Sequence, residues 1–178
     1  GEHVFDFGQN LTGWVETELE AEPGQTLVLH HAEALDEKGN FYTGNLSFAR
    51  ATDTWILAGG HAVVHPHFTW HGFRYLWVEG LREGQDARFT ACHLSTDLAQ
   101  TGSFHCSDKR VDRLQQNIQW SQRDNFLDIP TDCPQRSERL GWTGDVTAFC
   151  ATAAFNENIM PFMTNWLRDL ASEQTPET

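Results

Sequence analysis

The sequence predicts a mixed fold, in which an all-β sandwich is followed by antiparallel α-helices. Up to about residue 97 the apolar residues recur with a period of two, and after Thr101-Gly102 the period changes to about 3.6. Gly-containing turns also separate the short apolar runs of the first part, which is typical of sandwiches. The change of period divides the chain into a β part and an α part.

The first clear strand is Trp14 to Glu20, where apolar residues and threonine alternate with glutamates. A turn over residues 21–25 separates it from a second strand, Thr26 to His30. The other predicted strands are Thr52 to Leu57, Phe68 to Val78 and Ala87 to Leu94. The segment from Lys38 to Ala49 is rich in Gly and Asn, and we expect it to form a long loop.

Three helices are predicted in the second part. The first is capped by Ser107, and the chain leaves it at Asp128-Ile129-Pro130, since proline disfavours a helical residue before it. One face of this helix is formed by Val111, Leu114, Ile118 and Ser121. Two further helices are expected around Asp145 to Ala154 and Ile159 to Ala171. So few helical residues cannot close a core alone, and both ends of the chain look cut from a longer protein.

Composition excludes several classes of partner. The chain has 178 residues, with 25 Asp and Glu against 12 Lys and Arg, and its formal charge of -13 repels nucleic acids and anionic lipid surfaces. No apolar run approaches the ~18 residues of a membrane span. We therefore expect neither a nucleic-acid nor a membrane partner.

The cysteines and histidines give no firm sign of a metal or redox site. No CxxC pair occurs, so we expect the cysteines to be reduced and mostly buried in a cytoplasmic protein, although a single bridge remains open. Four histidines, at 61, 65, 67 and 71, fall within eleven residues, as zinc ligands often do. Their alternation suits one polar side of a strand, and we expect no metal there.

The most unusual segment runs from Pro130 to Asp145 and contains three carboxylates, two arginines and a tryptophan. Crowded carboxylates favour the protonated form of one of them, which is what a general acid requires, and Arg136 and Arg139 would keep the others ionised. Carboxylates beside an aromatic ring also suit a sugar site. A salt-bridged connector between two helices fits the same spacing equally well.

Four segments carry recognisable motifs: Phe5 to Trp14 (FDFGQNLTGW), His31 to Leu35 (HAEAL), Phe68 to Tyr75 (FTWHGFRY) and Asp132 to Asp145. Together they resemble the bacterial α-L-rhamnosidases of glycoside hydrolase family 78 over essentially the whole chain. The resemblance implies a β-sandwich domain over residues 1–98 and, over residues 99–178, the truncated start of an (α/α)6 catalytic barrel. It also implies hydrolysis of terminal α-L-rhamnose with inversion, and no cofactor.

By the same resemblance, Glu138 is the general acid that protonates the departing glycosidic oxygen. Asp132 and Asp145 match residues that bind the sugar hydroxyls, and Arg136 and Trp142 match further substrate-pocket positions. The partners implied are a rhamnose-containing glycoside or oligosaccharide and the remainder of the chain's own catalytic domain.

Two departures from the family pattern are expected to matter. Ser137 stands where the family usually has an aspartate immediately before the acid, so a negative charge beside Glu138 is missing. An inverting glycosidase also needs a second carboxylate as general base, which the family has far downstream. We therefore expect this chain alone to be inactive. The rival hypothesis is a non-catalytic carbohydrate-binding β-sandwich module, in which the acidic loop merely packs.

Overall fold

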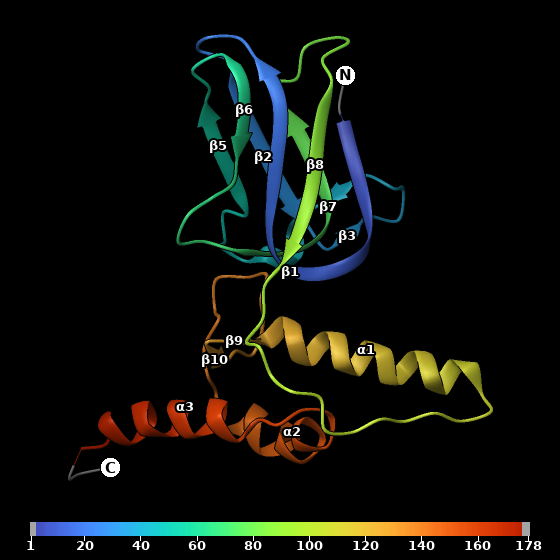
Figure 1. Ribbon diagram of the computed structural model, residues 1–178, viewed down its shortest axis with the longest axis vertical. Coiled ribbons are helices and arrows are strands. Elements are labelled where there is room, and N and C mark those ends of the chain that lie inside the picture. Colours follow the sequence, from blue (N-terminus) through green and yellow to red (C-terminus); the bar gives the residue numbers. More distant parts are fainter. Residues whose placement is uncertain (1–2, 176–178) are drawn as a thin grey trace. The chain divides into compact units, whose positions relative to one another are not determined.

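The computed structural model describes residues 3–175, which group into two units (Figure 1). The first unit contains the chain up to Leu94, together with a later stretch, Pro134–Ser137. The second contains Ser95–Cys133 and the chain from Glu138 onward. The predicted division at residue 98 did not include this return of Pro134–Ser137 to the first unit.

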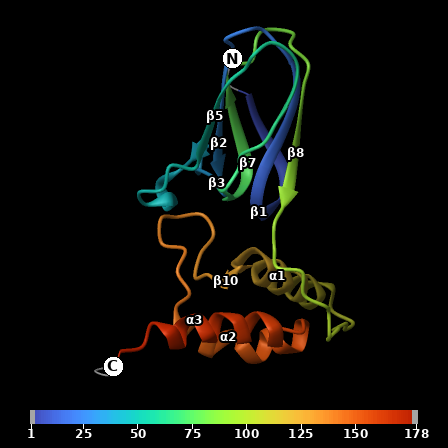
Figure 2. The ribbon, with the colours of Figure 1, turned by 60° about the vertical axis from the view of Figure 1, so that its left-hand side comes forward.

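The first unit is an antiparallel β-sandwich, which confirms the predicted fold class for this part. Its strands are β1 (His3–Ala21), β2 (Thr26–Ala32), β3 (Ala34–Leu35), β4 (Phe41–Tyr42), β5 (Thr52–Ile56), β6 (Gly60–Val64), β7 (His71–Glu79) and β8 (Ala87–His93). The main sheet has the order β5-β2-β7-β1-β6, and β8 also pairs with β1. Figure 2 labels β5, β2, β7, β1 and β8 of this sheet. The short strands β3 and β4 form a separate pair.

The long strand β1 organises the sandwich because it has three partners. Its first half pairs with β7, and its second half pairs with both β6 and β8. The register shifts between Asp6 and Leu11, and such an irregularity bends a strand, so one strand serves different parts of the sheet. Val15, Thr17 and Leu19 are at most 3% exposed, as the alternation predicted.

The segment between β5 and β7 differs from the prediction. Strand β6 was not predicted, and β7 begins at His71 rather than at Phe68. Residues 65–70 are not a strand, because Pro66 cannot donate to a ladder and Phe68 adopts a positive φ of 60°. The interpretation of His65 and His67 as one face of a strand was therefore wrong.

The predicted long loop between Lys38 and Ala49 contains some regular structure. Strand β4 and a 3-10 turn, Gly44–Leu46, lie within it. The remaining residues form turns and irregular backbone, so the loop was predicted in outline and its two short elements were missed.

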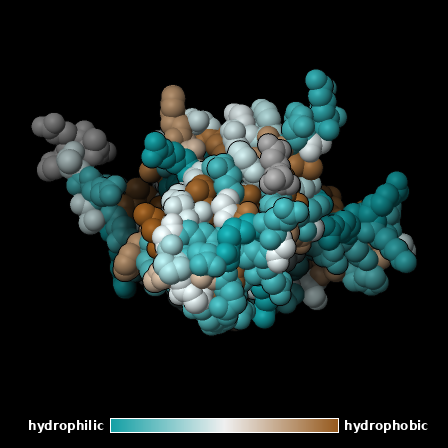
Figure 3. Space-filling view, turned by 90° about the horizontal axis from the view of Figure 1, so that it is seen from above, coloured by the Kyte–Doolittle hydropathy of each residue, from teal (hydrophilic) through white to brown (hydrophobic). Residues whose placement is uncertain are grey.

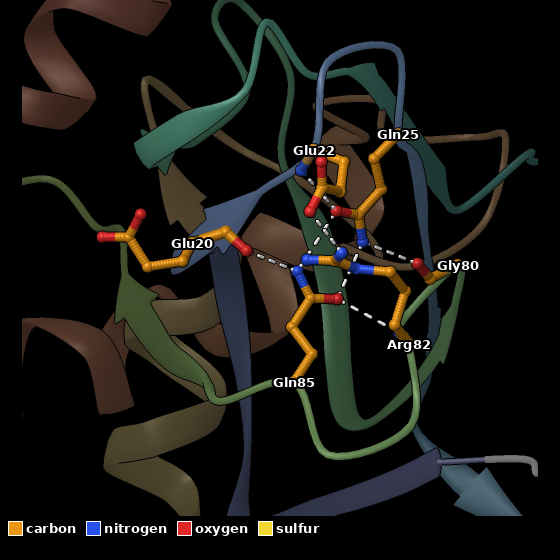
Figure 4. A network of polar contacts seen from close by, with 6 residues as sticks. All are labelled: Glu20, Glu22, Gln25, Gly80, Arg82 and Gln85. Atoms are coloured by element: carbon orange, nitrogen blue, oxygen red, sulfur yellow. Dashed lines mark hydrogen bonds and ion pairs between the residues drawn. The ribbon is translucent and has the colours of Figure 1, made fainter.

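At one end of the sandwich, the side-chain amides of two glutamines hydrogen-bond to each other (Figure 4). Gln25 and Gln85 donate to each other's side-chain oxygens, at 2.8 and 3.1 Å. Gln25 also donates to the Gly80 carbonyl at 2.8 Å, and Arg82 bonds the Glu22 carboxylate at 2.7 Å. These contacts tie the turn after β1 to the turn before β8.

Seen from above, hydrophilic residues dominate the surface, as the acidic composition leads one to expect (Figure 3).

The second unit is built on the three predicted helices. They are α1 (Lys109–Asn125), α2 (Thr143–Asn156) and α3 (Met160–Ser172), and the short strands β9 (Phe126–Leu127) and β10 (Ile129–Pro130) form a hairpin between α1 and α2. The N-cap of α1 is Asp108, which accepts from the Arg110 N–H, and not Ser107. Helix α1 ends at Asn125, before the predicted stop, because Phe126 has non-helical angles (φ −96°, ψ 70°) and begins β9.

A small apolar core in the second unit packs around Phe126. Its other buried members are Ala153, Ile159 and Phe162, and the Phe126 and Phe162 rings stack at 4.6 Å. The predicted apolar stripe of α3 is therefore partly core, whereas Leu167 on the same helix is 52% exposed. This core joins α2, α3 and the β9–β10 hairpin.

All four cysteines lie in the described part of the chain and carry free thiols. Only Cys133 is buried, and Cys92, Cys106 and Cys150 are half-buried, so the expectation that they are mostly buried was wrong. Among the helices of residues 3–175, none has the length and apolar character needed to cross a membrane.

Candidate active site

The segment predicted to carry the chemistry forms a closed loop between β10 and α2. The Asp132 N–H donates to the Leu140 carbonyl at 2.9 Å, and the Leu140 N–H donates to Asp132 Oδ1 at 2.8 Å. Residues 133–139 form the loop that these two bonds close. We call residues 132–142 the acid loop.

Backbone strain lies next to the predicted acid. Arg139 follows Glu138 directly and adopts a positive φ of 53°, which non-glycine residues rarely do. Such conformations cost on the order of 1–3 kcal/mol and cluster at functional sites. The bonds between Asp132 and Leu140 hold this conformation in place.

Glu138 is exposed at the surface of the acid loop, and its carboxylate is oriented by a tryptophan. The Trp142 indole Nε1–H donates to Glu138 Oε1 at 2.8 Å. Ligand-type atoms of Asp132, Cys133 and Glu138 lie within 4.8 Å of one another. This arrangement leaves the carboxyl accessible to a substrate and places a second carboxylate beside it, as a general acid requires.

Asp132 remains ionised in this cluster. Burial raises the pKa of its carboxyl, but hydrogen bonds from the Leu140 N–H, from the Cys133 side chain, from its own N–H and from Glu138 outweigh that effect, so its pKa lies below the ordinary value of 3.8. The carboxylate therefore supplies a fixed negative charge next to Glu138. Cys133, a buried member of this cluster, was missed from the sequence, where a lone cysteine gives no signal.

Asp132 and Asp145 line the same cavity, which has a volume of about 280 Å³. Asp145 lies in the first turn of α2, where the helix dipole favours a carboxylate. The apolar part of the wall is formed by Phe126, Pro130, Val146, Ala148 and Phe149. Two carboxylates in a mostly apolar hollow suit a ligand that carries hydroxyl groups on an apolar frame.

Trp142 forms the N-terminal boundary of α2 and is 48% exposed. Its indole N–H is occupied by Glu138, and the exposed part of its ring is available to a ligand. Arg136 is half-buried in the stretch that groups with the sandwich. The structure therefore brings Glu138, Asp132, Asp145 and Trp142 together in the second unit, whereas Arg136 belongs to the first.

The four clustered histidines of the first unit do not share a site. His61 lies 3.3 Å from Glu20, and His65 stacks on Trp14 with ring centroids 5.5 Å apart. His71 instead points into the sandwich, where its Nε2 lies 3.1 Å from the Asp53 carboxylate.

Comparison with known families decides what this arrangement belongs to. The profile of the bacterial alpha-L-rhamnosidase concanavalin-like domain matches residues 1–95. That of the bacterial alpha-L-rhamnosidase 6 hairpin glycosidase domain matches residues 99–178. The chain belongs to the bacterial α-L-rhamnosidase family. The resemblance inferred from the four motifs is thereby confirmed.

Individual members of the rhamnosidase family are similar along the whole chain. An alpha-L-rhamnosidase of Streptomyces avermitilis is 42% identical over 99% of this chain. The crystal structure of a Streptomyces avermitilis alpha-L-rhamnosidase complexed with L-rhamnose covers 99% of the chain with a TM-score of 0.94 and 43% identity. An Aspergillus terreus rhamnosidase structure covers 98% with a TM-score of 0.90 and 45% identity.

These relatives are much longer than the present chain. It spans 17% of the Streptomyces avermitilis proteins and 20% of the Aspergillus terreus structure. The likeness confirms the predicted combination of a sandwich with the opening helices of the rhamnosidase catalytic domain.

Proposed function

We propose that this chain contributes the sandwich and the acid loop to an α-L-rhamnosidase, which removes terminal α-L-rhamnose from glycosides with inversion. The observation that carries the proposal is the exposed Glu138 carboxyl, held by the Trp142 N–H at 2.8 Å beside the ionised Asp132. Membership of the rhamnosidase family supplies the sugar. The L-rhamnose bound to the Streptomyces avermitilis relative supports a rhamnose-containing substrate.

In the proposed mechanism Glu138 donates its proton to the glycosidic oxygen as the bond to the sugar breaks. Trp142 orients the carboxyl through its indole N–H and offers its ring to the sugar. Asp132 and Asp145 accept hydrogen bonds from the sugar hydroxyls, and Arg136 completes the pocket. Ser137, which replaces the usual aspartate, leaves Asp132 as the nearest negative charge to the acid within its loop.

The general base is proposed to lie outside this chain. Inversion requires a carboxylate that activates water about 6.5–9.5 Å from the acid, on the opposite face of the sugar. The partner needed is therefore the remainder of the catalytic domain.

The free thiols of the four cysteines support a reducing, cytoplasmic location for the protein.

The first experiment compares this chain with the complete protein on a panel of aryl glycosides that includes an α-L-rhamnoside. We expect release of the aryl group from the rhamnoside by the complete protein alone. Turnover by the isolated chain would indicate a base within it. If neither protein cleaves the rhamnoside, the non-catalytic carbohydrate-binding module becomes the better hypothesis.

The role of Glu138 is tested by Glu138→Gln in the complete protein. For a rhamnoside with a poor leaving group, we expect kcat to fall by about 100- to 10,000-fold, because no proton can be donated. For a rhamnoside whose leaving group departs without protonation, the loss should be far smaller. Binding of L-rhamnose, measured by calorimetry, should be nearly unchanged.

Glu37→Gln serves as the matched control, since Glu37 is an exposed glutamate of the sandwich. It should leave kcat unchanged for both leaving groups. An equal loss for both leaving groups in Glu138→Gln would argue against proton donation by Glu138 and in favour of a structural role.

A further inference from the structure

Three buried polar side chains meet inside the sandwich. They come from the three neighbouring strands β2, β5 and β7. His31, Asp53 and His71 are 0%, 9% and 5% exposed, respectively. Ligand-type atoms of the three lie within 4.8 Å of one another.

The orientation of His31 leaves an electron pair facing a carboxylate. His31 Nδ1 lies 3.1 Å from the Ala51 carbonyl oxygen, and because a carbonyl only accepts, this nitrogen carries the hydrogen. Its Nε2 therefore carries the lone pair. That atom is buried without a hydrogen-bond partner among residues 3–175, and it lies 3.9 Å from Asp53 Oδ2. Two electron-rich atoms therefore face each other inside the protein, which is costly unless a cation lies between them.

His71 completes the group from the other side. Its Nε2 lies 3.1 Å from both oxygens of Asp53, and its Nδ1 is also buried without a hydrogen-bond partner in the described part of the chain. The His31 and His71 rings stack with centroids 4.1 Å apart and planes 22° apart. Hydrogen bonding within the trio thus leaves one nitrogen of each imidazole unsatisfied.

We propose that His31, Asp53 and His71 bind a divalent first-row transition ion, with Zn²⁺ the best fit. Two imidazole nitrogens and one carboxylate oxygen form a common zinc ligand set. Donors at zinc-ligand distances around a tetrahedral ion are about 3.4 Å apart. The distances from Asp53 to His31 Nε2 and to His71 Nε2, 3.9 and 3.1 Å, lie on either side of this value.

The surroundings also suit a metal. The hydrogen bond from His31 Nδ1 to the Ala51 carbonyl is the kind of outer contact that orients metal-binding histidines. On binding the ion, His71 moves its proton from Nε2 to Nδ1 and stays neutral, so no proton is released. His31 and Ala51 also border a cavity of about 650 Å³, on the side from which an ion would approach His31. The ion would link β2, β5 and β7.

The test uses the complete protein, produced without a metal-affinity tag and stripped with a chelator. Titration with Zn²⁺ is expected to show one-to-one binding and to raise the thermal unfolding midpoint. Co²⁺ in its place is expected to give the strong visible absorption of a four-coordinate site. Asp53→Asn and His31→Gln should each weaken Zn²⁺ binding by more than about 100-fold.

His61→Gln is the matched control, because His61 is an exposed histidine of the same unit that faces Glu18 and Glu20. It should bind Zn²⁺ as tightly as the unaltered protein. The proposal is overturned if the unaltered protein neither binds Zn²⁺ nor shows the Co²⁺ absorption, a result that depends on no variant folding. It is also overturned if Asp53→Asn and His31→Gln retain the original affinity, since the ion would then lie elsewhere.

Discussion

Asp132 determines both the geometry and the charge of the acid loop. Its main chain and its carboxylate each form a hydrogen bond with Leu140, and these bonds close the loop on which Glu138 is presented. Burial raises the pKa of the carboxyl, but the hydrogen bond from the Leu140 N–H, together with those from Cys133, from its own N–H and from Glu138, lowers it below the ordinary value. A carboxylate with a lowered folded-state pKa stabilises the fold above its unfolded pKa and loses that contribution as the pH falls.

This reasoning predicts the behaviour of Asp132→Asn. The amide oxygen can still accept from the Leu140 N–H, so the loop should close, but the charge is removed. The stability advantage of the unaltered protein should be present above about pH 3.8, the ordinary pKa of this group, and should shrink as the pH falls through its lower folded-state pKa. Thermal midpoints of both proteins across this range provide the measurement. A pH-independent difference would contradict the assignment.

Helix α1 is anchored to the end of α2 by a buried polar network and not by its apolar stripe. Gln122 and Asn156 are each 1% exposed, and Asn156 Nδ2 donates to Gln122 Oε1 at 2.8 Å. Gln122 Nε2 lies 3.2 Å from Glu157 Oε2, and Arg123 Nε donates to the other oxygen at 3.0 Å. The predicted stripe is instead exposed at Val111 and Leu114, by 40% and 56%.

Removing the central member of this network should be costly. Gln122→Ala removes the acceptor of Asn156 Nδ2 and the donor to Glu157 Oε2, both buried, and we expect the free energy of unfolding to fall by about 1–3 kcal/mol. Gln116→Ala is the matched control, because Gln116 is an exposed glutamine of the same helix. It should change stability by less than about 0.5 kcal/mol. Equal effects in thermal unfolding would show that the network contributes little.

A glycine of β7 fits closely against the stretch that precedes the acid. A Cβ added at Gly72 would lie 3.0 Å from Gln135 Cβ and 3.1 Å from its Cα and N. Gln135 belongs to the four residues, Pro134–Ser137, that group with the sandwich, and Glu138 follows them directly. Strand β7 therefore restricts the backbone just before Glu138, the proposed acid.

Gly72→Ala in the complete protein should shift Gln135 by a few tenths of an ångström. Since a 1 Å misplacement of reacting groups can cost about 100-fold, we expect kcat for rhamnoside hydrolysis to fall by about 3- to 5-fold. KM and the thermal midpoint should change little. Unaltered kcat would show that the acid loop absorbs the added methyl group without effect on Glu138.

Each of the three helices carries large apolar side chains that are exposed. The residues are Val111, Leu114, Phe155, Met160 and Leu167, all between 40% and 69% exposed, and they are spread over α1, α2 and α3. The proposed remainder of the catalytic domain would cover such side chains, because exposed apolar surface often marks an interface.

We therefore expect the isolated chain to self-associate, and the complete protein to do so much less. Light scattering coupled to size-exclusion chromatography measures both. Leu114→Glu and Leu167→Glu should reduce self-association of the isolated chain and lower the thermal midpoint of the complete protein, in which these positions would be covered. A monomeric isolated chain at high concentration would count against this interpretation.

Local patterns in the sequence are sufficient for the division of the chain into β and α parts and for the loop that carries Glu138, whose role as the acid stays a prediction. Alternation in β1 and the 3.6-residue period of the helices depend on neighbours in the chain, so they are readable without a structure. The motif residues from Asp132 to Asp145 were likewise predictable, because they are contiguous.

Contacts between segments far apart in the sequence could be identified only from the tertiary structure. His31, Asp53 and His71 converge because β2 pairs with both β5 and β7, and no spacing in the sequence indicates that pairing. The polar anchoring of α1 was hidden for the same reason, since Gln122 meets Asn156 from 34 positions away. Burial of a polar side chain depends on which strands and helices pack against one another. A local sequence pattern does not show which distant elements do so.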